Sequence, residues 1–273
     1  YLDDIPTGHI KGCQICHSFD LKQVISLGFS APCDSLLTHE MLNSSETTYP
    51  LNLLRCRKCG LVQIDYAVDP SKLFYSEYPY RSGITETLKK NLHKTAEHVL
   101  KTCTIKPNSL VVDIGSNDGT ALEGFKMRGM RVMGVEPTNI ADLAIENGIE
   151  TINKFFSEEV VKEIVEKYGN AKIVTAANVF AHVSALSSFL KGIYELLSED
   201  GVFVSESHYM LDILETLQYD SIYHEHLRFY LIKPLIKLFE LSGFTLVNIE
   251  RIPNYGGSIR VYAQKGLNRN VSR

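Results

Sequence analysis

The densest group of titratable side chains in the sequence is Tyr223-His224-Glu225-His226. An imidazole beside a carboxylate and a phenol is suited to proton transfer, because histidine exchanges a proton near neutral pH and a neighbouring carboxylate can orient its ring. His224 and His226 would also share one side of an extended segment, where they could bind a metal ion. A third interpretation is a polar loop whose histidines are structural. Residue types alone leave all three interpretations open.

Four of the six cysteines form two C-x-x-C pairs, Cys13 with Cys16 and Cys56 with Cys59. A two-residue insert lets both thiolates turn toward one tetrahedral ion, and Gly60 suits the tight turn after the second pair. The pairs therefore predict a structural zinc ion, whose four sulfur ligands leave no position for water and stabilise a short, loop-rich segment. Two disulfides or a redox C-x-x-C are disfavoured, because a reducing cytoplasm and the missing βαβ context oppose them.

A glycine-containing loop joins a predicted strand that begins at Leu110 to a helical pattern over residues 121–128. The next predicted strand, 131–135, ends on Glu136, about 20 residues after Gly115, where a doubly wound fold presents a carboxylate to ribose hydroxyls. The glycine spacing is G-x-x-x-G, which differs from the G-x-G-x-x-G of pyrophosphate-binding loops. The segment therefore favours a nucleoside ligand without phosphates and argues against an NAD-dependent oxidoreductase.

Alternating helix and strand patterns continue beyond this loop. They predict helices over 157–168 and 187–197, and strands over 172–176, 201–205, 244–251 and 258–265. The alternation indicates an α/β fold with a doubly wound sheet, closed by a hairpin-like pair of strands. Ligands of such sheets bind at the carboxyl ends of the strands. The polar residues expected at that rim are Asn178, His182, Glu206 and His208.

The glycine loop, Val112-Asp113-Ile114-Gly115-Ser116-Asn117-Asp118-Gly119, resembles the first motif of the class I methyltransferases. Over the whole chain, the cysteine pairs, Tyr223-His224-Glu225-His226-Leu227 and Gly256-Gly257-Ser258-Ile259-Arg260-Val261 resemble the sugar C-methyltransferases. That family acts on nucleotide-linked 4-keto-deoxysugars. The resemblance implies a class I methyltransferase sheet with a small N-terminal zinc-binding module, S-adenosylmethionine as cofactor and a nucleotide-linked keto sugar as substrate.

The resemblance also implies roles for individual residues. The histidine matching His226 is the general base in that family, with Glu225 and Tyr223 beside it, and a tyrosine matching Tyr78 or Tyr80 enters the site. The cofactor-binding residues that we expect are Asp113, Gly115, Asn117, Gly119, Glu136 and Asn178. We expect the substrate to contact His182, His208 and His224.

These residue types agree with methylation of a carbon atom. A carbon next to a ketone becomes a nucleophile only after it loses a proton, and a positioned base accelerates such a step by roughly 10²–10⁴-fold. His226 would take the proton, Glu225 would hold the imidazole in one tautomer or share its proton, and a tyrosine hydroxyl would hydrogen-bond the enolate oxygen. A methyltransferase acting on oxygen, nitrogen or a non-sugar carbon needs no such base and is the alternative. A binding module with a vestigial cofactor pocket is a third hypothesis.

We expect four regions along the chain. They are a four-cysteine zinc-binding module in 1–70, a helical connector that contributes to the active site in 71–108, a domain that binds S-adenosylmethionine in 109–265, and a linker in 266–273. Members of the family continue into a further C-terminal α/β domain that helps to bind the nucleotide, so we expect a fragment or a shortened relative. Cys33 and Cys103 lack matching partners and are expected to be ordinary small apolar residues.

The composition is that of a globular protein, with 44% hydrophobic and 22% charged residues. A net charge of -4 lacks the excess of basic residues with which proteins bind nucleic acids or anionic membrane surfaces. No apolar run approaches the roughly 20 residues that span a bilayer, and no signal pattern opens the chain. We therefore expect a cytoplasmic monomer that acts on a small molecule.

Overall fold

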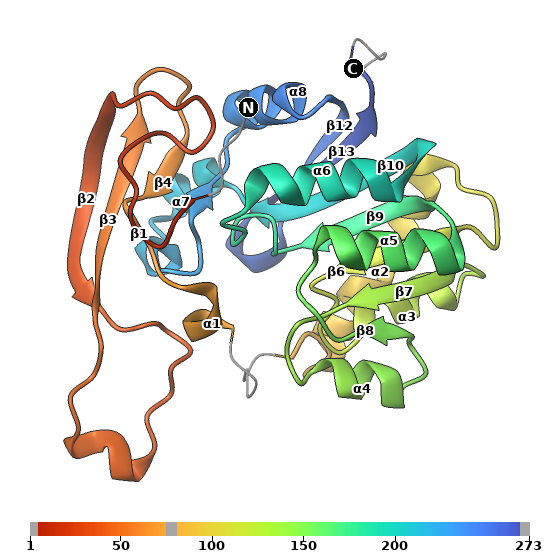
Figure 1. Cartoon of the computed structure of the whole chain (residues 1–273), viewed down its shortest axis with the longest axis horizontal. Helices are drawn as coiled ribbons and strands as arrows, with labels where there is room; N and C mark the ends of the chain where they lie inside the picture. Colours follow the sequence, from red (N-terminus) through yellow and green to blue (C-terminus); the bar gives the residue numbers. More distant parts are fainter. Residues whose placement is uncertain (1–4, 75–80, 268–273) are drawn as a thin grey trace.

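The computed structural model of the chain describes residues 5–74 and 81–267 (Figure 1). A region of strands near the N-terminus lies beside a larger layer of helices and strands. We call residues 5–74 the N-terminal module and residues 81–267 the α/β domain. No helix in these two ranges is long and apolar enough to cross a membrane.

The sheet of the α/β domain has seven strands in the order β12-β13-β10-β9-β6-β7-β8. The strands β6 to β10 run parallel, whereas β13 lies antiparallel between β10 and β12. The predicted doubly wound sheet and its closing strand pair are therefore confirmed. The strands are β6 (Leu110–Ile114), β7 (Arg131–Val135), β8 (Thr151–Ile152), β9 (Ala171–Ala177), β10 (Leu197–His208), β12 (Phe244–Ile252) and β13 (Ser258–Lys265).

Helices cover both faces of this sheet. The buried side chains of α5, α6 and α8 pack on one face, and those of α2, α3 and α4 pack on the other. The helices are α2 (Glu86–Cys103), α3 (Thr120–Lys126), α4 (Ala141–Glu146), α5 (Glu158–Tyr168), α6 (Leu186–Leu196), α7 (Met210–Thr216) and α8 (Ile232–Leu241). The elements α4, α7 and β8 are too short to carry a clear periodic pattern, so the sequence does not predict them.

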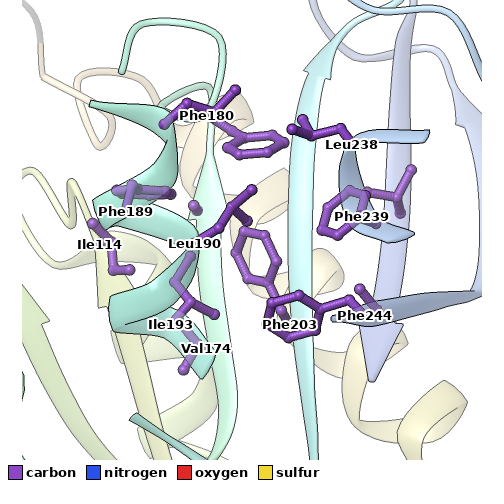
Figure 2. Packing of buried hydrophobic residues seen from close by; sticks show 14 of the residues in the cluster. Ile114, Val174, Phe180, Phe189, Leu190, Ile193, Phe203, Leu238, Phe239 and Phe244 are labelled. Atoms are coloured by element: carbon purple, nitrogen blue, oxygen red, sulfur yellow. The ribbon is translucent and has the colours of Figure 1, made fainter. Parts of the chain in front are cut away.

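The core under α6 and α8 is rich in aromatic rings, as Figure 2 shows. The ring of Phe180 is fully buried and lies 5.3 Å from the ring of Tyr230, 5.7 Å from Phe239 and 5.9 Å from Phe203, measured between centroids. Aromatic pairs at these distances stabilise a core beyond the burial of their area. Because Phe180 belongs to the loop that follows β9, this packing fixes the loop in which two predicted site residues lie.

The N-terminal module is built on a four-stranded antiparallel sheet in the order β11-β4-β3-β2. The long pair β2 (Leu21–Ser30) and β3 (Tyr49–Cys56) dominates it, and a second small pair joins β1 (Gly8–His9) to β5 (Tyr66–Ala67). The expectation of a short, loop-rich segment was therefore wrong. The stretch between the cysteine pairs is long enough for a hairpin, and β3 alternates inward Leu51 and Leu53 with less buried neighbours.

One strand of this sheet comes from the other part of the chain. The strand β11 (Arg228–Phe229) pairs antiparallel with β4 (Val62–Ile64), although it lies just before α8 in sequence. Apolar side chains of both parts share one core, including Leu53, Phe229 and Met210. The N-terminal module and the α/β domain are therefore joined by a strand pairing and by a common core.

The remaining short elements are helix α1 (Pro70–Leu73) and three 3-10 turns. The turns are η1 (His39–Asn43), η2 (Tyr219–Ser221) and η3 (Asn254–Gly256). The turn η2 comes directly before the histidine cluster, so it sets the direction in which the chain enters that cluster.

Candidate functional site

A cavity of about 700 Å³ lies at the carboxyl ends of the parallel strands and reaches to the N-terminal module. Its walls come from the glycine loop after β6, the loops after β7, β9 and β10, and the histidine cluster. The predicted nucleoside loop and the predicted proton-transfer group therefore share one cavity. Its polar lining includes Asp113, Ser116, Asn117, Glu136, Asn178, His182, Glu206, His208, Tyr223, Glu225 and His226.

The glycine loop has the backbone that its two glycines permit. Gly115 has φ +68°, and a Cβ atom there would overlap the side chain of Val179. Gly119 has φ +77° at the start of α3, and a Cβ atom there would lie 3.1 Å from the Cβ of Ala144. Both positions need glycine, because an L side chain would be strained by conformation and by contact. The G-x-x-x-G spacing thus shapes the floor of the cavity.

Glu136 is a buried carboxylate at the carboxyl end of β7. Its Oε2 accepts a hydrogen bond of 2.9 Å from the backbone amide of Asn117, and its Oε1 accepts from the amide and the hydroxyl of Thr138, at 3.0 and 2.7 Å. A carboxylate has about four acceptor positions, so capacity remains for a ligand. About one acceptor position remains, which suits recognition of a ribose hydroxyl.

Asp113 lies at the carboxyl end of β6, fully buried beside the cavity. Burial raises the pKa of this carboxyl to about 7, although the Thr175 hydroxyl donates to it at 2.6 Å. Two further buried groups of the lining, Ser116 Oγ and Asn178 Oδ1, have no hydrogen-bond partner among the described residues. Buried polar atoms are normally satisfied, so these two indicate a site built for a polar ligand.

The connector before α2 closes over the glycine loop. The backbone amide of Ser82 donates to Asn117 Oδ1 at 2.7 Å, and that of Gly83 donates to Asp118 Oδ2 at 2.7 Å. Asn117 itself has φ +52°, which asparagine tolerates better than most residues. The side chains of the loop therefore hold the connector in place beside the cavity.

His226 is buried, and both of its ring nitrogens have partners. Its Nδ1 lies 2.8 Å from the carbonyl oxygen of Ser221, and its Nε2 lies 3.0 Å from the hydroxyl of Tyr223. A carbonyl can only accept, so Nδ1 carries the proton and Nε2 receives the hydrogen bond of Tyr223. Burial, together with the nearby His208, lowers the pKa of His226 to about 3. The imidazole is therefore a neutral base with its lone pair on Nε2.

Two more histidines flank His226. The centroid of the His182 ring lies 4.9 Å from that of His226, and the centroid of His208, the last residue of β10, lies 4.8 Å away. Burial lowers the pKa of both, and that of His182 falls well below its ordinary value. The Nε2 atom of His182 has no partner among the described residues. Three neutral imidazoles thus line one wall of the cavity.

Glu225 does not hold the ring of His226 in the way that we expected. Its Oε2 lies 3.8 Å from Nδ1 of His182, and its Oε1 lies 3.7 Å from the thiol of Cys33. The tautomer of His226 is set by the carbonyl oxygen of Ser221 in the preceding turn η2, because this oxygen accepts the hydrogen bond of Nδ1. Cys33 is also not an ordinary apolar residue, since it lines the cavity. Nothing in its sequence surroundings indicates this contact.

Two groups of predicted residues lie elsewhere. His224 is buried but is not in the lining: its Nε2 lies 3.2 Å from the carbonyl oxygen of Pro50, and its ring faces Tyr49 across 5.9 Å. The chain turns at His224 and Glu225, with the amide of His226 donating to the carbonyl of Tyr223, and is not extended here. His224 therefore faces the N-terminal module while His226 faces the cavity. Tyr78 and Tyr80 lie outside the described residues.

A buried ion pair supports the wall after β10. Arg260 Nε donates to Glu206 Oε1 at 2.6 Å, and both side chains are almost fully buried. Arg260 also donates to Thr95 Oγ1 on α2, at 3.1 Å. Glu206 was expected at the rim, whereas its partner on β13 was not predicted, because the pairing depends on the register of two distant strands.

The four cysteines of the two pairs lie together in the N-terminal module. All four Sγ atoms lie within 4.8 Å of one another, with 3.4 Å between Cys13 and Cys59 and 3.5 Å between Cys16 and Cys56. Tetrahedral zinc with bonds of about 2.3 Å places sulfurs about 3.8 Å apart, so the cluster fits that ion. The amide of Cys59 also points at Cys56 Sγ, at 3.5 Å. A thiolate in that position would be stabilised.

We expect the purified chain to carry one zinc ion in this cluster. Cys56→Ser should lose the metal and lower the melting temperature by about 5 °C or more, because a structural zinc ion contributes folding free energy. Cys103→Ser, which lies outside the cluster, should keep both zinc and melting temperature near those of the wild type. Elemental analysis and calorimetry measure the two quantities. A metal-free Cys56→Ser with unchanged melting would contradict a structural role.

The buried imidazole of His226 also predicts a pH dependence of stability. Its pKa is about 3 when folded and about 6.5 when unfolded, so the unfolded chain binds more protons between these values. The unfolding free energy should therefore fall as the pH drops below 6.5, by up to about 1.4 kcal/mol per pH unit for this group. Asp113, with its raised pKa, acts in the opposite direction in the same range.

The contribution of His226 can be separated by a difference measurement. Urea unfolding at pH 7.5, 6.5 and 5.5 should show a smaller loss of stability on acidification in His226→Asn than in the wild type. Equal losses in the two proteins would mean that His226 is not buried as a neutral base.

Comparisons with known proteins agree with this architecture. Residues 13–74 match a family model described as "Putative zinc binding domain", and residues 80–249 match one described as "Methyltransferase domain". The C-methyltransferase NovU of Streptomyces niveus is 34% identical over 93% of this chain. The match spans 60% of the length of that relative.

Solved structures support the fold alone. The magnesium protoporphyrin IX methyltransferase of Synechocystis PCC 6803, solved with bound SAH, is 12% identical and has a TM-score of 0.51, over 68% of this chain and 90% of its own. The 1,6-didemethyltoxoflavin-N1-methyltransferase of Burkholderia thailandensis is 21% identical with a TM-score of 0.50, over 64% and 78%.

These matches and the sheet order establish the class I methyltransferase fold. The methyltransferase model covers more than half of the chain, and the zinc-binding model covers the module that precedes it. The chain therefore belongs to the methyltransferase family, with an N-terminal zinc-binding domain.

Proposed function

We propose that this chain is the core of an S-adenosylmethionine-dependent C-methyltransferase that acts on a nucleotide-linked 4-keto-deoxysugar. The observation that carries the proposal is the neutral imidazole of His226, which lines the same cavity as the glycine loop and whose Nε2 accepts from Tyr223, another residue of the lining. Transfer to carbon needs a base of this kind, whereas transfer to oxygen or nitrogen does not. The likeness to the C-methyltransferase NovU and the resemblance to the sugar C-methyltransferases support the same reaction class.

The residues present at the glycine loop fit S-adenosylmethionine, which supplies an electrophilic methyl group when it is bound. Glu136 would accept from a ribose hydroxyl with its remaining acceptor position. Ser116 Oγ and Asn178 Oδ1, which lack partners among the described residues, would bind the polar groups of the ligand. Asp113 and Asn117 complete the polar floor. A ligand without phosphates agrees with the G-x-x-x-G spacing.

His226 would remove the proton from the carbon next to the ketone of the sugar. Its Nε2 accepts that proton, while the carbonyl of Ser221 holds the Nδ1 proton and stabilises the imidazolium as it forms. Burial makes imidazolium unfavourable in the absence of substrate, so near neutral pH the ring of His226 is in its neutral, proton-accepting form. An anionic nucleotide and a developing enolate in the cavity would favour the charged ring.

Tyr223 is placed to respond to that proton transfer. In the structure its hydroxyl donates to Nε2 of His226 at 3.0 Å. When Nε2 becomes protonated it turns from acceptor to donor, and the phenol would then direct its own proton at the enolate oxygen. His182, whose Nε2 has no partner among the described residues, and His208 would contact the sugar from the wall that they share with His226.

The zinc cluster takes no direct part in this chemistry. Its four sulfur ligands leave no open coordination position, so its contribution is to the fold. The methyl group would pass directly from the cofactor to the carbon that His226 has deprotonated.

The test is turnover of nucleotide-linked 4-keto sugars with S-adenosylmethionine, followed as S-adenosylhomocysteine formation and a product heavier by one methylene group. His226→Asn should lower kcat by about 100-fold or more, because a general base contributes about that much. Its Kd for S-adenosylmethionine, measured by calorimetry, should stay within about twofold of the wild type. His39→Asn, an exposed histidine on η1, is the matched control and should keep full turnover.

The outcomes separate the hypotheses. A His226→Asn variant as active as the wild type would indicate an acceptor that needs no deprotonation at carbon. A wild-type chain that binds S-adenosylmethionine but methylates no keto sugar would reject the proposed substrate. A chain that does not bind the cofactor would reject the activity altogether.

A further inference from the structure

The segment that carries His226 is held from two sides. We call residues 222–230 the His226 segment. The amide of Leu227, the residue after His226, donates to the carbonyl of Ala181 in the α/β domain, at 3.1 Å. The carbonyl of the same Leu227 accepts two hydrogen bonds from the N-terminal module: one from the amide of Ile64 and one from Nε2 of Gln14, each 3.2 Å long. The peptide next to the base is therefore fixed by both parts of the chain.

Gln14 stands inside the first cysteine pair, between Cys13 and Cys16. It is only 5% exposed, and its backbone amide donates to Gln63 Oε1 at 2.9 Å. Gln63 in turn donates through Nε2 to the carbonyl of Gly12, at 3.1 Å. Gln63 is fully buried on β4 and pairs across the sheet with Arg228 of the His226 segment. The turn that presents Cys13 and Cys16 is thus bound to the strand that holds the His226 segment.

Only one end of the Gln14 side-chain amide has a hydrogen-bond partner among the described residues. Its amide nitrogen makes the bond to Leu227, whereas its Oε1 is buried without a partner among the described residues. An unsatisfied buried carbonyl destabilises a fold, and an apolar residue of similar length would avoid it. A glutamine at this position is therefore explained by the hydrogen bond that its amide nitrogen donates to the His226 segment. Packing alone would be served as well by an apolar side chain.

We propose that Gln14 is a positioning residue for His226, and that the metal site at Cys13 and Cys16 acts on the reaction through it. The ion fixes the backbone of the turn, and the Gln14 side chain carries that geometry to the carbonyl of Leu227. The inference rests on the proposed function, because it takes His226 as the base. If the imidazole is displaced by a fraction of an ångström, it is no longer aligned with the reacting carbon, although the imidazole itself is unchanged.

The test compares Gln14→Met with Gln23→Met in the full chain. Methionine keeps the length of the side chain and removes its donor. Gln23 lies exposed on β2 of the same module, so it is the matched control. Three properties are measured: zinc per chain, kcat and KM for the keto sugar, and the imidazole nitrogen NMR signals of His226, assigned by their loss in His226→Asn. The NMR signals report the position of the ring independently of turnover.

We expect Gln14→Met to keep its zinc and its Kd for S-adenosylmethionine, to lose about 10- to 100-fold in kcat with little change in KM, and to shift the His226 signals. Gln23→Met should match the wild type in all three properties. A zinc-loaded, folded Gln14→Met with wild-type kcat and unshifted His226 signals would overturn the proposal. Absence of turnover in the wild type would reject the proposed function instead, and the NMR comparison would still decide the positioning role.

A second measurement covers the case in which Gln14→Met does not fold. Zinc is withdrawn from the wild type with a chelator while the His226 signals and the amide signal of Gly119, in the glycine loop, are followed together. We expect the His226 signals to shift in step with zinc loss while the Gly119 signal stays in place. His226 signals that do not move, or that move only together with Gly119, would contradict the proposal, since the second result indicates general unfolding.

Discussion

The pairing of β11 with β4 is the interaction on which the site depends. It is only two residues long, yet it carries the chain from the turn η2 past the cavity and into the sheet of the N-terminal module. His226 lies immediately before Leu227, whose peptide is bonded to both parts of the chain. Beside this pairing, the Leu227 amide donates to the Ala181 carbonyl in the α/β domain, so both parts of the chain hold the histidine cluster at the carboxyl ends of the parallel strands. The module is therefore a wall of the site.

Burial of polar groups is the second constraint, and it acts throughout the cavity. His226 and the four carboxylates of the lining, Asp113, Glu136, Glu206 and Glu225, are buried, whereas His182 and His208 are partly buried. Desolvation keeps His226 neutral, and Glu136 accepts three hydrogen bonds from the loop residues around it. Preorganised groups of this kind need little rearrangement during a reaction. The unsatisfied atoms among them mark where a ligand is to bind.

Local spacing was enough to predict the fold class and much of the site. The G-x-x-x-G loop, Glu136 and the two cysteine pairs are patterns within short stretches, and the structure brings each set together. Contacts that join distant segments could not be predicted in this way. The contact of His224 with Pro50 joins residues 174 positions apart, and that of Cys33 with Glu225 joins residues 192 positions apart. The Ser221 carbonyl is only five positions from His226, but its role depends on the turn η2, which has no clear sequence pattern. The alternation of apolar residues in β3 is a sequence signal for the sheet of the N-terminal module.

The late position of β11 also has a consequence for synthesis of the chain. The zinc ligands and β2 to β4 leave the ribosome early, whereas the strand that completes their sheet is translated more than 150 residues afterwards. Until then β4 presents an open edge, and such edges recruit other strands. An early metal-bound hairpin would thus wait for its last strand while the intervening α/β units form. The edge of β4 closes late in folding, by a long-range pairing, and the same event assembles the wall of the cavity that carries His226.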